Sequence, residues 1–328
     1  MFIVYLISQR QHVFSILKQR SIKRMRARKI RKKTKFINSK QMGSFVDVRF
    51  DIVGEHKHGK QSHTFEASIH YLDKGEGEPL ILVHGIGQSL YTWFKNIDYF
   101  AGKGYRVIAL DLAGFGYSSH PNIYYTVEET VIILKVFLEK LNIEKAHFVG
   151  FSTGALSIVS LAHEHPQLVD KMVLIAPGGP NENYPFAMRF LTTRIGHMML
   201  RLWFAENAIE RVLREIHFDK PLVTKHTIDQ YYEPFKRKRV RDTLAMTMAH
   251  FDDEKALSYL RATTNDTLVF SGENDPIHSS GMIASYANNI PGAKHIRLRN
   301  CGHVVHEEKP KRVNSEILMF FGHKDVEQ

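Results

Sequence analysis

Ser152 lies in the pattern G-x-S-x-G at residues 150–154. A short apolar run, residues 146–150, precedes the serine, and a helix-length segment that ends before Pro166 follows it. At such a strand–turn–helix corner the serine hydroxyl projects above the sheet, and the next backbone N–H points toward a developing oxyanion. The two glycines suit a tight corner, because a Cβ would collide with the packed helix. The pattern therefore predicts a nucleophilic serine.

The elements around this corner predict an α/β fold. Apolar runs of strand length alternate with helix-length segments, which is typical of a mostly parallel, doubly wound sheet with helices on both faces. Thr126 with Glu129 three residues later is a capping box that opens a helix running to about Leu141. The predicted strands of the parallel part are 79–83, 106–110, 146–150, 171–176, 267–271 and 295–298.

The alternation stops between the strand that ends at Ala176 and the one that starts at Thr267. Two segments rich in Met, Phe, Tyr and Trp, 189–212 and 223–250, have the length of helices. We therefore predict a helical cap that covers the end of the sheet and lines a substrate pocket. The predicted organisation is a core made of residues 43–176 and 267–328 and a cap made of residues 177–266.

The charge of the chain is concentrated at its N-terminus. The net charge is +11, yet residues 1–40 contain thirteen Lys or Arg and no Asp or Glu, so the remainder is close to neutral. This distribution gives no support to nucleic-acid binding by the folded domain. Residues 1–42 are predicted to be a disordered tail or, alternatively, a peripheral anchor whose residues 1–40 contact an anionic membrane. No segment is apolar for long enough to span a membrane, and a cytoplasmic location is expected.

Two further residue types carry little chemical information. Cys301 is the only cysteine, which excludes an intramolecular disulfide and a cysteine-based zinc site, and suits a reducing compartment. His56, His58, His63 and His70 lack the helical spacing and the carboxylate partners of a metal site, so they are predicted to be surface histidines.

The chain resembles the α/β-hydrolase superfamily, and in particular its members with a helical cap, over residues 43–322. The resemblance rests on five segments that occur in the order of the family. They are the oxyanion loop His84-Gly85-Ile86-Gly87, the D-x-x-G-x-G-x-S segment at 111–118, the nucleophile corner at 150–154, the acid loop Gly272–Pro276, and the histidine loop Gly302-His303 with Glu308 and Pro310.

The resemblance implies a role for each residue of the site. Ser152 would be the nucleophile, His303 the base that takes its proton, and Asp275 the acid that orients the imidazole. The backbone N–H groups of Ile86 and Thr153 would donate to the oxyanion. Further roles are implied for His84 and Gly85, which would support the oxyanion loop; no metal and no cofactor is implied. Asp111 is expected to anchor its own turn rather than to enter the triad.

The predicted function is that of a serine hydrolase. Serine at the corner disfavours the dehalogenases and epoxide hydrolases of the superfamily, which carry aspartate there. The main hypothesis is cleavage of a carboxylic ester, a thioester or a lactone of a small, largely apolar substrate through an acyl-enzyme on Ser152. Two alternatives stay open: hydrolysis of a carbon–carbon bond in a diketone, and a ligand-binding signalling module that retains the triad.

Overall fold

The computed structural model describes residues 42–56, 59–179, 193, 196 and 206–323. The predicted tail, apart from its last residue, lies outside these ranges, so both alternatives for it stay predictions. Within the described ranges, no helix combines the length and the apolar character that crossing a bilayer demands.

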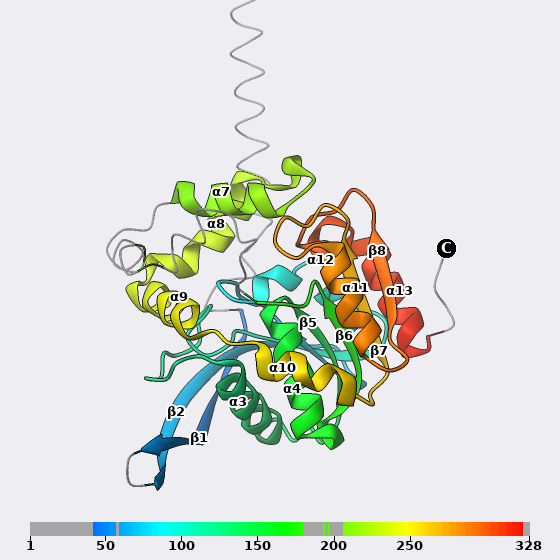
Figure 1. Ribbon diagram of the computed structural model, residues 1–328. Helices are drawn as coiled ribbons and strands as arrows, with labels where there is room; N and C mark the ends of the chain where they lie inside the picture. Colours follow the sequence, from blue (N-terminus) through cyan, green and yellow to red (C-terminus); the bar gives the residue numbers. More distant parts are fainter. Residues whose placement is uncertain (1–41, 57–58, 180–192, 194–195, 197–205, 324–328) are drawn as a thin grey trace, which may run out of the picture. The chain divides into compact units, whose positions relative to one another are not determined.

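Eight strands form one sheet in the order β1-β2-β4-β3-β5-β6-β7-β8 (Figure 1). The pairs from β4 to β8 are parallel, whereas β1 and β2 form an antiparallel hairpin that joins the sheet through an antiparallel β2–β4 pairing. Every residue of β5 and β7 is buried, as expected for strands covered on both faces. The strands are β1 (Ser44–His56), β2 (Gly59–Lys74), β3 (Glu78–Val83), β4 (Tyr105–Leu110), β5 (Ala146–Phe151), β6 (Val169–Ile175), β7 (Thr267–Gly272) and β8 (Lys294–Leu298).

Helices connect and cover the parallel strands. Helix α3 packs against α4, and α2 contacts α13. The predicted capping box begins α3: the Glu129 N–H donates to Thr126 Oγ1 at 3.2 Å, and the Thr126 N–H donates to Glu129 Oε2 at 3.0 Å. The helices of the core are α2 (Ile97–Ala101), α3 (Val127–Lys140), α4 (Thr153–Glu164), α11 (Ser280–Asn289), α12 (Val305–Glu308) and α13 (Pro310–Phe321).

Between β6 and β7 the described chain contains four α-helices, which occupy part of the predicted cap. The single helix predicted over 223–250 is wrong, because a 3₁₀ turn that contains Pro234 divides it. Proline has no N–H to donate and its ring clashes with the preceding turn. The segment 189–212 lies largely outside the described residues. The four helices are α7 (Glu206–Ile216), α8 (Lys225–Tyr232), α9 (Lys238–His250) and α10 (Glu254–Ser258).

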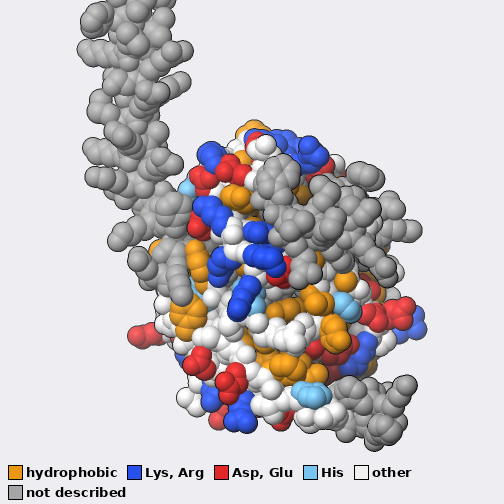
Figure 2. Space-filling view, turned by 90° about the vertical axis from the view of Figure 1, so that its left-hand side faces the viewer, with side chains coloured by type: hydrophobic (Ala, Val, Ile, Leu, Met, Phe, Trp, Pro, Cys, Tyr) orange, Lys and Arg blue, Asp and Glu red, His pale blue; other side chains and the backbone are white. Residues whose placement is uncertain are grey.

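The surface of the described region carries both signs of charge. On the face shown in Figure 2, Lys and Arg side chains lie among Asp and Glu side chains and hydrophobic groups. This mixture agrees with the near-neutral composition outside residues 1–40.

The prediction of surface histidines is wrong for His70, which is fully buried. Its Nδ1 lies 2.8 Å from Asp111 Oδ2, a partner that is distant in sequence and therefore invisible to a search for local metal-ligand spacing. Asp111 also accepts the N–H groups of Leu90 and Tyr117, each at 2.7 Å. The prediction that Asp111 anchors its turn is confirmed.

The carboxylate of Glu308 joins the segment that follows α7 to Gly302, the residue before His303. This side chain is 8% exposed. Its Oε1 accepts the Gly302 N–H at 2.7 Å, and its Oε2 accepts the N–H groups of Phe218 and Asp219, just beyond α7, at 3.0 and 2.9 Å. Both oxygens are therefore occupied by backbone amides from two segments that are far apart in sequence.

A direct backbone contact reinforces this junction. The N–H of His303 donates to the carbonyl oxygen of Ile216, the last residue of α7, at 2.8 Å. Residues 216–219 and residues 302–303 are thus joined by one direct hydrogen bond and by three more that run through the carboxylate of Glu308.

A buried polar cluster forms a second junction, between α8 and the residues at 92 and 306–307. Tyr231 of α8 donates from its hydroxyl to the carboxylate of Glu307, and Thr92 Oγ1 donates to Glu307 Oε1 at 2.7 Å. Thr92 Oγ1 also lies 2.7 Å from Nε2 of His306. Burial raises the pKa of Glu307 and lowers that of His306 well below its ordinary value. The cluster therefore favours the uncharged form of both groups.

His278 holds the segment that leaves β6. Its Nδ1 lies 3.2 Å from the Ala176 carbonyl oxygen, its Nε2 lies 2.9 Å from that of Gly179, and the side chain is fully buried. A Cβ at Gly178 would approach this ring to 2.6 Å. Burial, reinforced by the charge of His303, lowers the pKa of His278 to about 4.

We predict that Glu308→Ala destabilises the protein by roughly 3 kcal/mol, because three backbone amides that the carboxylate satisfies lose their acceptor. The free energy of unfolding in urea measures the effect. Glu210→Ala, which removes a partly exposed glutamate that pairs with Arg214 within α7, is the matched control. That control should change stability by less than about 1 kcal/mol. Equal effects of the two variants would contradict a structural role for Glu308.

His278 should make the protein acid-sensitive. A histidine whose pKa is lower in the folded state than in the unfolded state contributes stability that is lost as pH falls. The loss starts near the ordinary value of 6.5 and continues to about pH 4. The full shift corresponds to about 3 kcal/mol.

The measurement is the urea unfolding free energy of wild type and His278→Gln at several pH values between 7 and 4. The variant should be less stable at pH 7 but show a shallower decline toward pH 4. His163→Gln is the control for replacing an exposed histidine. Parallel curves for wild type and His278→Gln would contradict the prediction.

Candidate active site

Ser152 stands at the corner between β5 and α4 in a backbone conformation that non-glycine residues rarely adopt. Its φ is 53° and its ψ is −121°, and the side chain is buried. Gly154 is required at this corner, since a Cβ there would lie 2.4 Å from the His84 carbonyl oxygen. Gly150 is required as well, since its Cβ would lie 2.6 Å from Ala155 Cα. The local sequence thus permits the close strand–helix approach that exposes the serine hydroxyl to the site.

The structure brings Asp275 and His303 together. His303 Nδ1 lies 2.8 Å from Asp275 Oδ2, and the other carboxylate oxygen accepts the N–H groups of Ile277 and His278 at 2.8 and 3.0 Å. Burial alone would raise the pKa of Asp275, but the charge and hydrogen bond of His303, with a smaller contribution from His278, hold it below its ordinary value. The carboxylate is therefore ionised at neutral pH and orients the imidazole with Nε2 left for another partner.

The Ser152 hydroxyl donates to the Gly178 carbonyl oxygen at 3.4 Å. Among the described contacts, its hydrogen bond is thus with this carbonyl and not with His303. The His303 ring packs beside the ring of Phe151, with centroids 4.8 Å apart, so it stands next to the strand end that carries Ser152.

The oxyanion loop has the predicted residues and one unpredicted contact. His84 is fully buried; its Nε2 accepts the Leu112 N–H at 2.9 Å and its Nδ1 lies 2.8 Å from the Gly85 carbonyl oxygen. Burial lowers the pKa of His84, which fits a neutral ring that donates from Nδ1. The N–H of Ile86, however, donates to the side-chain oxygen of Thr153 at 2.9 Å. The Thr153 side chain therefore accepts the proton of one of the two amides predicted to bind the oxyanion, that of Ile86.

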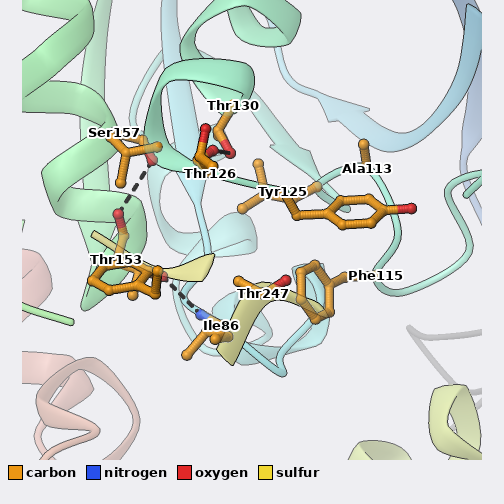
Figure 3. A pocket seen from close by; sticks show the side chains of 12 residues that line it. Ile86, Ala113, Phe115, Tyr125, Thr126, Thr130, Thr153, Ser157 and Thr247 are labelled. Atoms are coloured by element: carbon orange, nitrogen blue, oxygen red, sulfur yellow. Dashed lines mark hydrogen bonds between the residues drawn. The ribbon is translucent and has the colours of Figure 1, made fainter. Parts of the chain in front are cut away.

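A pocket opens beside these residues (Figure 3). It lies between the oxyanion loop, the start of α3 and α4, and the end of α9. None of the twelve side chains that line it is charged at neutral pH. They are Ile86, Leu112, Ala113, Phe115, Tyr125, Thr126, Val127, Thr130, Thr153, Ser157, Thr247 and Phe251.

Asp275, His278 and His303 also form a group whose potential ligand atoms lie within 4.8 Å of one another. Both ring nitrogens of His278 face backbone carbonyl oxygens, and Nδ1 of His303 faces Asp275. A neutral imidazole has one N–H, so His278 donates to one of these two carbonyl oxygens. These ring nitrogens face protein oxygens rather than a common ion. His278 was not predicted from the sequence; its position three residues after Asp275 is the only signal that marks it.

Comparison with known proteins identifies the fold. Residues 78–310 match the sequence profile of the α/β hydrolase fold family. The chain is 26% identical over 253 residues to the uncharacterized hydrolase YugF of Bacillus subtilis, covering 76% of this chain and 92% of the relative. It is 29% identical over 272 residues to a 2-hydroxy-6-oxononadienedioate/2-hydroxy-6-oxononatrienedioate hydrolase of Paraburkholderia phymatum, covering 78% and 92%.

A solved structure shows the same architecture. The thermophilic esterase of Thermogutta terrifontis superposes with a TM-score of 0.70 at 21% identity, covering 85% of this chain and 98% of the esterase. At this identity the likeness concerns the fold, with its mostly parallel sheet and covering helices. The profile match spans well over half of the chain and includes the corner at Ser152 and the histidine loop. The chain therefore belongs to the α/β hydrolase fold family and is a hydrolase.

Proposed function

We propose that this protein is a serine hydrolase that cleaves a carboxylic ester or lactone through an acyl-enzyme on Ser152. The observation that carries the proposal is the hydrogen-bonded pair of Asp275 and His303 beside a serine at a strained strand–helix corner. A serine hydroxyl attacks a carbonyl at neutral pH only when a base accepts its proton, and His303 Nε2 is the base in reach of this corner.

The reaction would follow from these positions. When substrate enters, the Ser152 hydroxyl leaves the Gly178 carbonyl and transfers its proton to His303 Nε2 as its oxygen bonds to the substrate carbonyl carbon. Asp275 stabilises the imidazolium that forms. The imidazolium then protonates the leaving alkoxide, and a water molecule, activated by the neutral His303, releases the acid from Ser152.

The pocket supports a neutral, largely apolar substrate. Its walls contain apolar side chains and hydroxyls but no Lys, Arg or His. A carboxylate buried there would lose its hydration without gaining a cationic partner. The proposal therefore assigns uncharged acyl groups to this site.

Carbon–carbon bond hydrolysis is the second candidate. It is favoured by the relative from Paraburkholderia phymatum, whose name describes a hydrolase of 2-hydroxy-6-oxo dioic acids. The same three residues could serve that chemistry, because it also requires attack on a carbonyl group. The uncharged pocket argues against a dioic acid as the substrate of this chain.

We predict that a fluorophosphonate probe forms one adduct on the wild-type protein. Ser152→Ala should form none, because the nucleophile is missing. His303→Ala and Asp275→Asn should react at least about 100-fold more slowly, since the proton acceptor is lost or wrongly oriented. Intact-mass spectrometry measures the adduct, and circular dichroism verifies the fold of each variant. A folded wild type that forms no adduct would remove the support for an activated serine and favour the ligand-binding alternative.

A matched pair of esters tests the substrate class. Butyrate and hemisuccinate esters of p-nitrophenol have acyl chains of similar size, but only the hemisuccinate carries a carboxylate. We expect kcat/KM for the butyrate to be at least about tenfold higher, because the charge must be desolvated in the pocket. Equal or higher activity on the hemisuccinate, or faster turnover of 2-hydroxy-6-oxononadienedioate, would instead favour the second candidate.

A further inference from the structure

The hydroxyl oxygen of Thr153 occupies the position toward which the Ile86 N–H points, and this N–H is one of the two predicted oxyanion donors. Thr153 directly follows Ser152, and its Oγ1 accepts the N–H of Ile86 at 2.9 Å (Figure 3). Ile86 therefore has no amide proton left for a substrate oxygen as long as this bond persists. The side chain of Thr153 also lines the pocket, which is the space proposed above for the substrate.

One other pocket hydroxyl, that of Thr126 at the start of α3, also accepts a backbone N–H, from Glu129 at 3.2 Å. The remaining pocket hydroxyls are arranged differently. Four of them donate their proton to a backbone carbonyl oxygen four residues earlier in the chain, at distances between 2.6 and 3.2 Å. Such hydroxyls have little left to offer a substrate. They belong to Tyr125, Thr130, Ser157 and Thr247.

Thr153 uses its hydroxyl oxygen as an acceptor instead. In the described part of the chain its own proton meets no protein acceptor, so the proton is available to the pocket. The hydroxyl belongs to the residue whose backbone N–H is the other predicted oxyanion donor. One residue therefore presents two donors next to the nucleophile.

We infer that the Thr153 hydroxyl is a catalytic hydrogen-bond donor that, together with the Thr153 N–H, forms the oxyanion hole. The inference rests on the proposed acyl-enzyme reaction at Ser152. Ile86 acts through Thr153: its N–H polarises the hydroxyl oxygen and so strengthens the bond that the hydroxyl donates to the oxyanion. The proton stays on Thr153 throughout, and no bond to it is broken.

In the alternative arrangement, the Thr153 hydroxyl rotates away when substrate binds, and the Ile86 N–H then donates directly to the oxyanion. That arrangement requires a β-branched side chain to change rotamer and an existing hydrogen bond to break before each turnover. The relayed arrangement needs neither, and donors that are already in place are those that stabilise a transition state most effectively.

Three substitutions at Thr153 separate the two arrangements. Thr153→Val keeps the shape and removes the hydroxyl, Thr153→Ala also opens space at the Ile86 N–H, and Thr153→Ser keeps the hydroxyl. The second-order rate of fluorophosphonate labelling should fall by roughly 10- to 100-fold in the Val and Ala variants, since one oxyanion donor is lost. The Ser variant should stay within about threefold of wild type.

Wild-type or faster labelling of either the Val or the Ala variant would overturn the inference, because it would show that Ile86 donates directly once the hydroxyl is gone. A Ser variant as slow as the Val variant would also overturn it, because the loss would then follow the methyl group. Thermal unfolding of each variant excludes an effect of misfolding.

The structure of the wild-type phosphonate adduct gives a second readout. The phosphoryl oxygen should lie within hydrogen-bond distance of Thr153 Oγ1 and of the Thr153 nitrogen, with Ile86 still bonded to Oγ1. A phosphoryl oxygen bonded to Ile86 nitrogen instead would contradict the inference. The adduct on Ser152 itself tests the proposed function, whereas the variant-to-wild-type ratio tests Thr153, so the two failures are distinguishable.

Discussion

The left-handed backbone at Ser152 is the constraint on which the site depends. A non-glycine residue with φ near 53° costs on the order of 1–3 kcal/mol and persists only where the surrounding structure enforces it. Here the Ser152 N–H donates to the Ile175 carbonyl oxygen of β6 at 2.9 Å, and Gly154 lies against the backbone at the end of β3. Three neighbouring strands and α4 therefore converge on one residue, and the central sheet holds the buried serine in this conformation.

Asp275 and His303 are positioned by loops rather than by a strand–helix corner. Asp275 and His303 come from the segments that follow β7 and β8, and they approach the serine only because those strands lie in order beside β6. The segment at Gly302 and His303 is also bonded to residues 216–219, at and beyond the end of α7, through Glu308 and Ile216. His303 is therefore held by this segment as well as by Asp275.

The sequence alone predicted the parts of the site that obey local rules. Ser152 is detectable because strand, turn and helix must follow one another there, and Asp111 because its segment closes on itself. His70 was misjudged because its partner Asp111 is 41 residues away. The division between α8 and α9 was missed although Pro234 marked it, because the apolar pattern on both sides suggested one helix. The contact between Thr153 and Ile86 depends on side-chain rotamer and loop path, which no residue pattern encodes.

The pocket chemistry and the charged pair have to be considered together. The ionised Asp275 is bonded to His303, whereas the pocket lined by Ile86 and Thr153 has no charged side chain in its walls. In such a region of low polarity, donors beside the nucleophile interact more strongly with a developing negative charge than they would in water. Most hydroxyls of the pocket walls do not compete for the negative charge, because they already donate to backbone carbonyl oxygens. In the proposed reaction, the shape of the pocket and the desolvation of the substrate determine which substrate binds. The negative charge of the oxyanion is stabilised by Thr153 and the Ile86 N–H bonded to it.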